Sequence, residues 1–177
     1  MDVIVYIALS LDGYIAGSNN DLSWLDQLND DIPSDNPYEF NRFLETVGAI
    51  ILGRRTYDWE VDNGHGDAHP LPKFILTNRP PHPKARKDDV FTNEDIVEVI
   101  QKAKAITRKK IWVEGGANVV QQCIANDLLD EMILFIAPIL LGRGIPLFGS
   151  LNAYKQFMLR KATALPSGLA LLEYERK

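Results

Sequence analysis

The 177-residue chain is long enough to bury one sizeable core without disulfides or a structural metal, so we predict a single domain over residues 1–177. Its 24 acidic and 19 basic residues give a formal net charge of −5, which argues against nucleic acid as a partner. The single cysteine, Cys123, lies in an apolar stretch, as is common in proteins of a reducing compartment.

The chain opens with "MDVIVYIALS", whose residues 3–9 form a β-branched apolar run typical of a strand buried on both faces. This opening carries Asp2, has no basic leader and is too short to span a membrane. We therefore expect a cytoplasmic protein with no membrane partner. The next segment, "SLDGYIAGSNNDLSW", is predicted to be a loop.

A helix start is marked near residue 36, with Asn36 as N-cap, Pro37 at the first helical position and Glu39 three residues after the cap. The predicted helix buries one stripe: Phe40, Phe43, Leu44 and Val47. Thr92 or Asn93 should cap a second long helix, whose inward residues are Ile96, Val97, Val99, Ile100 and Ala103. Further helices are predicted directly after residue 53 and over 117–126.

Further strands are predicted at 49–53, 73–78, 111–113 and 130–140, each an apolar run. Two segments joined by the turn "PSG", 155–165 and 169–176, are typical of a β-hairpin. Strands that alternate with helices predict an α/β fold. It should have a mostly parallel central sheet, helices on both faces and a C-terminal antiparallel hairpin.

The stretch "IWVEGGANVV" places two glycines between a strand and a helix. Because glycine lacks a Cβ, Gly115 and Gly116 would allow a phosphate to approach the amides of Ala117 and Asn118 at the helix start. The alternative is a tight turn that needs a positive φ angle, which explains one glycine more readily than two.

Five stretches, in this order and spacing, resemble dihydrofolate reductase and, more closely, the reductase (C-terminal) domain of the bacterial riboflavin-biosynthesis deaminase-reductase. They are "IALSLDGYIAG", "AIILGRRTYDW", "KFILTNRP", "IWVEGGANVV" and "DEMILFIAPILLGRGIPLF". The resemblance implies a three-layer dihydrofolate reductase-like fold, reductase activity and a homodimer. It also makes the Gly115–Gly116 peptide a candidate for cis geometry. The deaminase half and its zinc motif are absent, and we predict no metal site.

The resemblance implies NADPH as cofactor. Ala8, Ile15 and Ala16 would line the nicotinamide pocket, and Arg54 with Arg79 would recognise the 2′-phosphate. The remaining residues that would bind the cofactor are Gly53, Thr56, Thr77, Asn78, Gly115, Gly116, Ala117, Asn118 and Val119.

The proton donor is less strongly marked. Glu114 and Asp12 are the candidates, and we rank Glu114 first because a carboxylate beside a bound pyrophosphate would repel it and should face the substrate. Asp12 could instead form a turn. The acid of dihydrofolate reductase would fall at Asp35 or Asn36, and Asn36 is better explained as a helix cap.

Three further features bear on function. Val120 replaces a tyrosine of dihydrofolate reductase, which argues against pterin recognition. Trp24 could cover the nicotinamide or simply pack. The run "HGDAH", residues 65–69, has metal-like spacing, but a solvated loop is the preferred interpretation.

Together these features predict an NADPH-dependent reductase that resembles 5-amino-6-(5-phosphoribosylamino)uracil reductase and transfers a hydride to a small heterocyclic or carbonyl substrate. The alternatives are a dihydrofolate reductase and a non-catalytic nucleotide-binding module.

Overall fold

The computed structural model describes residues 2–27, 36, 38–66, 68–151 and 153–177. Within them, an eight-stranded sheet has the order β5-β4-β3-β6-β1-β7-β10-β9. Every pairing is parallel except those of β10 with β7 and β9. The strands are β1 Val3–Ser10, β2 Tyr14–Ala16, β3 Val47–Gly53, β4 Lys73–Leu76, β5 Val90–Thr92, β6 Lys110–Gly115, β7 Glu131–Ala137, β8 Ile145–Pro146, β9 Phe157–Ala164 and β10 Ala170–Arg176.

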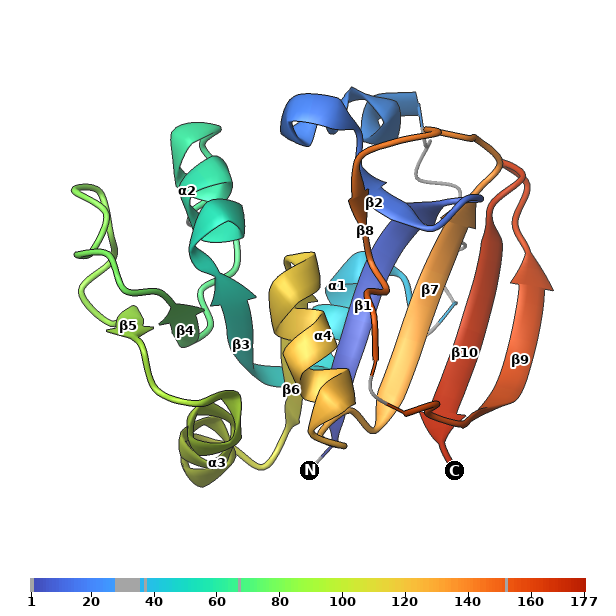
Figure 1. Ribbon diagram of the computed structural model, residues 1–177. Helices are drawn as coiled ribbons and strands as arrows, with labels where there is room; N and C mark the ends of the chain where they lie inside the picture. The colour runs from blue at the N-terminus through green and yellow to red at the C-terminus, as the bar shows by residue number, and fades with distance from the viewer. Residues whose placement is uncertain (1, 28–35, 37, 67, 152) are drawn as a thin grey trace.

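The helices lie on both faces of the sheet, so the fold has three layers (Figure 1). They are α1 Phe40–Thr46, α2 Arg54–Asp62, α3 Ile96–Ile106 and α4 Ala117–Ala125, with short 3-10 turns η1 Ser18–Asn20 and η2 Ser23–Gln27. This architecture confirms the predicted three-layer dihydrofolate reductase-like fold with its C-terminal hairpin.

Successive residues of a strand point to opposite faces of the sheet, and they pack into two separate cores. In β1, Val3 and Val5 pack with α3 and α4, whereas Ile4 packs on the other face with aromatic residues of α1 and α2. Cys123 is fully buried in the α3/α4 core, and burial raises the pKa of its thiol to about 12. The thiol therefore acts as a small apolar group.

Two predicted helix starts were wrong. α1 begins at Phe40, with Glu39 as N-cap accepting from the amide of Arg42, while the Asn36 side chain accepts from the amide of Tyr38 in the preceding turn. α3 is capped by Asp95, which accepts from the amide of Val97, and not by Thr92 or Asn93. Several polar side chains near each start can cap locally, and packing decides which one does. Pro37 lies outside the described residues.

Two short strands interrupt the predicted loop after β1 and the segment after β7. β2 pairs antiparallel with β8 in a separate two-stranded ribbon, which brings residue 14 beside residue 146. β5 adds a parallel edge to β4. Strands of two or three residues have too little pattern to be detected in the sequence.

Within the described part of the chain, no helix has the length and apolar character required to cross a bilayer.

Candidate active site

A cavity of about 1210 Å³ lies at the carboxyl ends of the central parallel strands. Its walls come from β1, the start of α2, the end of β6, the start of α4 and the β2/β8 ribbon. Ligands of open parallel sheets bind at this edge because the loops and helix starts converge there. In Figure 1 both chain termini lie at the opposite end of the molecule.

Two helix starts meet in this cavity, and neither is capped by a side chain. Gly53 is the N-cap of α2 and Gly116 is the N-cap of α4. A Cβ built on Gly53 would lie 3.6 Å from the amide nitrogen of Gly116, so the two starts are in direct contact. The first amides of both helices thus point their positive ends toward one region, which suits a polyphosphate.

Most of the residues predicted for the site line this cavity. They are Ala8, Ile15, Ala16, Gly53, Arg54, Thr56, Arg79, Glu114, Gly116, Ala117, Asn118 and Val119. Thr77, Asn78 and Gly115 do not: the Thr77 hydroxyl accepts from the amide of Arg79 in a turn, Asn78 is exposed, and Gly115 ends β6 with φ +136°. The Gly115–Gly116 peptide is cis, as the resemblance implied.

Asp12 does not line the cavity. Its Oδ1 accepts from the Ser10 hydroxyl at 2.6 Å and from the Leu141 amide, and its Oδ2 accepts from the Gly142 amide at 2.7 Å. The bond from Ser10, followed by those from the two amides, lowers the pKa of Asp12. An ionised carboxylate that joins two loops cannot serve as a proton donor at neutral pH, so the structure favours the turn interpretation over a catalytic one.

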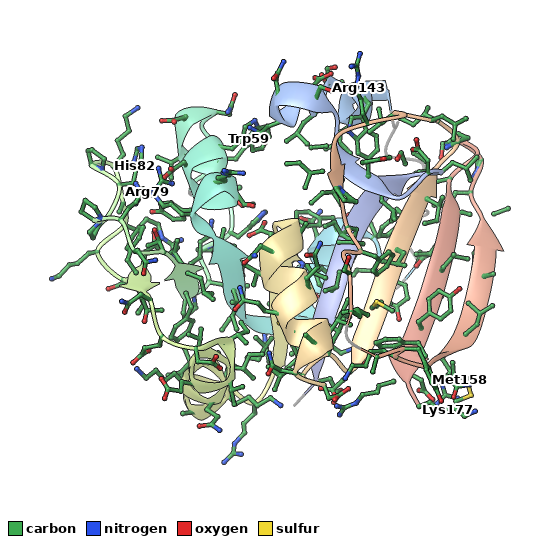
Figure 2. The ribbon with its side chains drawn as sticks, viewed as in Figure 1. Trp59, Arg79, His82, Arg143, Met158 and Lys177 are labelled. Carbon is green, nitrogen blue, oxygen red and sulfur yellow. The ribbon has the colours of Figure 1, made fainter. Side chains whose placement is uncertain are left out.

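Asp58, which we did not predict, lies between the two arginines. It accepts from Arg54 Nε and, through its second oxygen, from Arg79 Nη2 at 2.9 Å. Arg54 also donates through Nη1 to the carbonyl of Pro80. A guanidinium has five N–H groups, so three of Arg54 stay available to a ligand. Trp59 and Arg79, labelled in Figure 2, come from α2 and from the loop after β4.

Glu114 is the buried acid of the cavity. Its side chain is 11% exposed, and no donor reaches its Oε2 among the described residues. Burial, then the negative charge of Glu60 and a hydrogen bond with it, raise the pKa of Glu114 well above its usual range, against the smaller opposing effect of Lys73. The raised pKa favours the protonated form of Glu114, which is the form that a proton donor needs.

Behind Glu114 lies an ion pair that the sequence analysis missed. The fully buried Lys73 donates to Glu60 Oε2 at 2.6 Å, and Glu60 is 5% exposed. Lys73 also donates to the carbonyl of Gly66. A signal was present: Tyr57 and Glu60 are three residues apart on the buried face of α2, and Lys73 heads an apolar strand.

The other predicted features are structural in the described residues. Trp24 and Val120 are buried in the cores and do not line the cavity, so Trp24 packs and Val120 carries no information about substrate. Asp35 lies outside the described residues. In the run 65–69, His65 stacks on Trp59 and Asp67 is not described.

The chain matches the family of the RibD C-terminal domain over residues 2–171. It belongs to this family. It is 32% identical to the uncharacterised protein YwjB of Bacillus subtilis (strain 168), over 89% of this chain and 88% of that protein. The residues that line the cavity described above therefore all lie within the part of the chain that matches the RibD C-terminal domain.

Solved structures agree with this family assignment. A Shewanella sp. PV-4 protein, provisionally named a riboflavin biosynthesis protein, superimposes with a TM-score of 0.87 at 31% identity, over 100% of this chain and 99% of that one. The Thermotoga maritima diaminohydroxyphosphoribosylaminopyrimidine deaminase/5-amino-6-(5-phosphoribosylamino)uracil reductase gives a TM-score of 0.71 at 16% identity. There the match covers 99% of this chain and 56% of the larger protein, and it shows the fold alone.

Proposed function

We propose that this protein is an NADPH-dependent reductase of a small heterocyclic substrate that resembles an aminopyrimidine. One observation carries the proposal: two uncapped helix starts and a buried carboxyl group with a raised pKa, Glu114, lie in the same cavity. Membership of the RibD C-terminal domain family supports the same reaction class.

The residues present fit the cofactor. A volume of about 1210 Å³ exceeds the ~300–1,000 Å³ of a pocket for one drug-sized ligand, so it has room for a dinucleotide and a small substrate. A Cβ on Gly116 would meet only the Thr56 hydroxyl, at 3.4 Å, so its backbone is open to a phosphate. Ala8, Ile15 and Ala16 supply an apolar wall suited to a nicotinamide ring.

The cofactor supplies a hydride when bound, and the chain's own residues do the rest. The amides at the starts of α2 and α4 would hold the diphosphate, and Arg54 with Arg79 would hold the 2′-phosphate. Glu114 keeps a proton at its carboxyl group and donates it to the substrate atom that gains negative charge. The apolar wall excludes water.

The proposal is tested by adding NADPH and a panel of pyrimidine, pterin and quinone-like substrates and following NADPH absorbance. Reduction of an aminopyrimidine would support it. Turnover of dihydrofolate in preference would instead support a dihydrofolate reductase, and binding of NADPH without turnover of any panel member would support a non-catalytic module.

Arg54→Ala should raise the NADPH dissociation constant about tenfold, and should affect NADH less, because charged hydrogen bonds to the 2′-phosphate are lost. Asp58→Asn is the matched control: it removes the opposing charge and should increase the preference for NADPH. Fluorescence titration measures both. An equal loss for NADPH and NADH in Arg54→Ala would place Arg54 outside the 2′-phosphate site.

Gly116→Ala should raise the NADPH dissociation constant about tenfold and leave the melting temperature within about 2 °C of wild type. Gly116 has φ −73°, which alanine adopts freely, so the added Cβ obstructs the ligand and not the fold. Gly115→Ala is the contrast, because φ +136° makes a side chain cost ~1–3 kcal/mol of stability. Unchanged affinity in Gly116→Ala beside a large fall in melting temperature would contradict the phosphate role.

We also propose that the protein forms a homodimer through residues 138–151. Large apolar side chains are exposed there, with Leu140 at 71%, Phe148 at 45% and Leu151 at 40%. Sedimentation equilibrium at micromolar concentration should give twice the chain mass of 19.9 kDa. The double variant Leu140→Asp/Phe148→Asp should give the mass of a single chain. A monomeric wild type would refute this.

A further inference from the structure

Arg55 is the unpaired cation of the cavity. The charged side chains that line the cavity belong to Arg54, Arg55, Asp58, Arg79 and Glu114. Arg54 and Arg79 both donate to Asp58, which partly neutralises their charges. The exposed side chain of Arg55 forms no ion pair and no hydrogen bond with any residue that the structure describes. All five N–H groups of its guanidinium are thus available to an anion.

Trp59 lies one helical turn further along α2 and also lines the cavity. The residue is 41% exposed, although tryptophan is highly buried on average. His65 stacks on its ring, with 5.6 Å between the centroids and 19° between the planes, which holds the indole in place without burying it. A large ring that is held in place and lines a cavity is suited to stack on a planar ligand.

The spacing of residues on α2 separates this pair from the residues proposed for the cofactor. Side chains four residues apart share a face of a helix, and each residue is turned by about 100° from the one before. Arg54 and Asp58 form one row, which faces Arg79. Arg55 and Trp59 form the next row, on the side of α2 that faces η1 and η2 in Figure 2. The residues of that facing segment that line the cavity are Asn20, Leu22 and Leu25.

A third row of α2 leads to the buried acid. Thr56 lines the cavity, and Glu60, one turn further, forms a hydrogen bond with Glu114. The row of Arg55 and Trp59 is next to this row on the helix. A ring that stacks on Trp59 therefore extends toward the acid while an anionic group contacts Arg55. The Cβ atoms of residues four apart are about 5–6 Å from each other, so the anionic group has to lie close to the ring.

We propose that Arg55 and Trp59 form a substrate subsite for a planar heterocyclic ring with an anionic group, a carboxylate or a phosphate, attached close to it. Trp59 stacks on the ring, and Arg55 pairs with the anion. A neutral ring makes the stacking contact alone, so the subsite favours the acid over its neutral counterpart. The inference rests on the proposed function, because it names the substrate class of the same cavity.

The first test measures binding without cofactor and without turnover. Orotate differs from uracil by one carboxylate, and uridine 5′-monophosphate differs from uridine by one phosphate. Isothermal titration calorimetry should give a dissociation constant about tenfold lower for the acid in at least one pair. A larger gain in the first pair identifies a carboxylate on the ring, and a larger gain in the second identifies a phosphate on a sugar. Equal affinities within both pairs overturn the proposal.

Variants assign the two contacts. Arg55→Gln should remove the preference for the acid, and Arg108→Gln, at an exposed arginine after α3, should keep it. Trp59→Leu should weaken the acid and its neutral partner alike, by about tenfold, and Trp59→Phe should keep most of the affinity because a ring still stacks. The indole NMR signal of Trp59 should shift when the acid is added, while that of the buried Trp112 should not. A preference that survives Arg55→Gln, or an unshifted Trp59 signal, overturns the proposal.

A third measurement separates this subsite from the cofactor. Arg55→Gln should change the NADPH dissociation constant by less than about twofold, in contrast to the tenfold rise expected for Arg54→Ala. A tenfold loss of NADPH affinity in Arg55→Gln would assign Arg55 to the cofactor and overturn the proposal. None of these experiments involves hydride transfer. If NADPH is never oxidised, the proposed function fails, whereas the affinities for the acids and their neutral partners still decide this inference.

Discussion

Glu114→Gln is expected to lower kcat by about 100-fold or more, because a general acid contributes that much and glutamine has no proton to give. Cofactor affinity should stay near wild type, since the amide keeps the size of the carboxyl group. Glu98→Gln, on the exposed face of α3, is the matched control and should leave kcat unchanged. Steady-state kinetics measures both. Full activity in Glu114→Gln would remove Glu114 from the mechanism.

The raised pKa of Glu114 sets the direction of two pH effects. Activity requires the protonated form, so kcat should fall as pH rises through the raised pKa. The folded state holds this proton at pH values where the unfolded chain has released it. The free energy of unfolding should therefore fall as pH rises from the ordinary pKa of a glutamate to the raised pKa of Glu114. Glu114→Gln should lose both dependences and melt no lower than wild type at alkaline pH.

Lys73→Met is expected to lower the free energy of unfolding by ~3–5 kcal/mol, because it leaves the Glu60 charge buried without a partner. For a chain of this size, that corresponds to a fall in melting temperature of about 10 °C. Thermal unfolding measures this.

Two variants control for Lys73→Met. The exposed pair of Lys102 and Glu94 predicts a loss of at most ~1 kcal/mol for Lys102→Met. The double variant Lys73→Met with Glu60→Leu should recover much of the stability, because no unpaired charge remains. Equal melting temperatures for Lys73→Met and Lys102→Met would show that the buried pair has no special role in stability.

The long elements of the fold could be predicted because their pattern is local. The apolar runs that became β1, β3 and β7 are buried on both faces, and such runs are visible without knowledge of their neighbours. β2 and β8 could not be predicted, because each is a strand only by virtue of the other, some 130 residues away. The start of α1 was misplaced because Asn36 and Glu39 both accept a nearby amide.

Some residues of the candidate site could likewise be predicted from the sequence, and others could not. Gly53 and Gly116 could be placed because a glycine between a strand and a helix has a local meaning. Asp58, Glu60 and Lys73 were missed because their roles depend on the packing of α2 against β4 and the loop that follows β4. Asp12 was ranked as a candidate acid because the sequence does not show that two amides of a distant loop bind it.

The β2/β8 ribbon has a consequence for synthesis of the protein. One wall of the cavity is formed jointly by Ile15 and Ala16 of β2 and by Ile145 and Pro146 of the strand that pairs with it, β8. A nascent chain therefore carries its first wall residues long before their partners leave the ribosome. The early strand β1 likewise waits for β6 and β7 to flank it. Ligand binding should accordingly arise only after β8 has left the ribosome, and a chain released before β8 should be unable to bind.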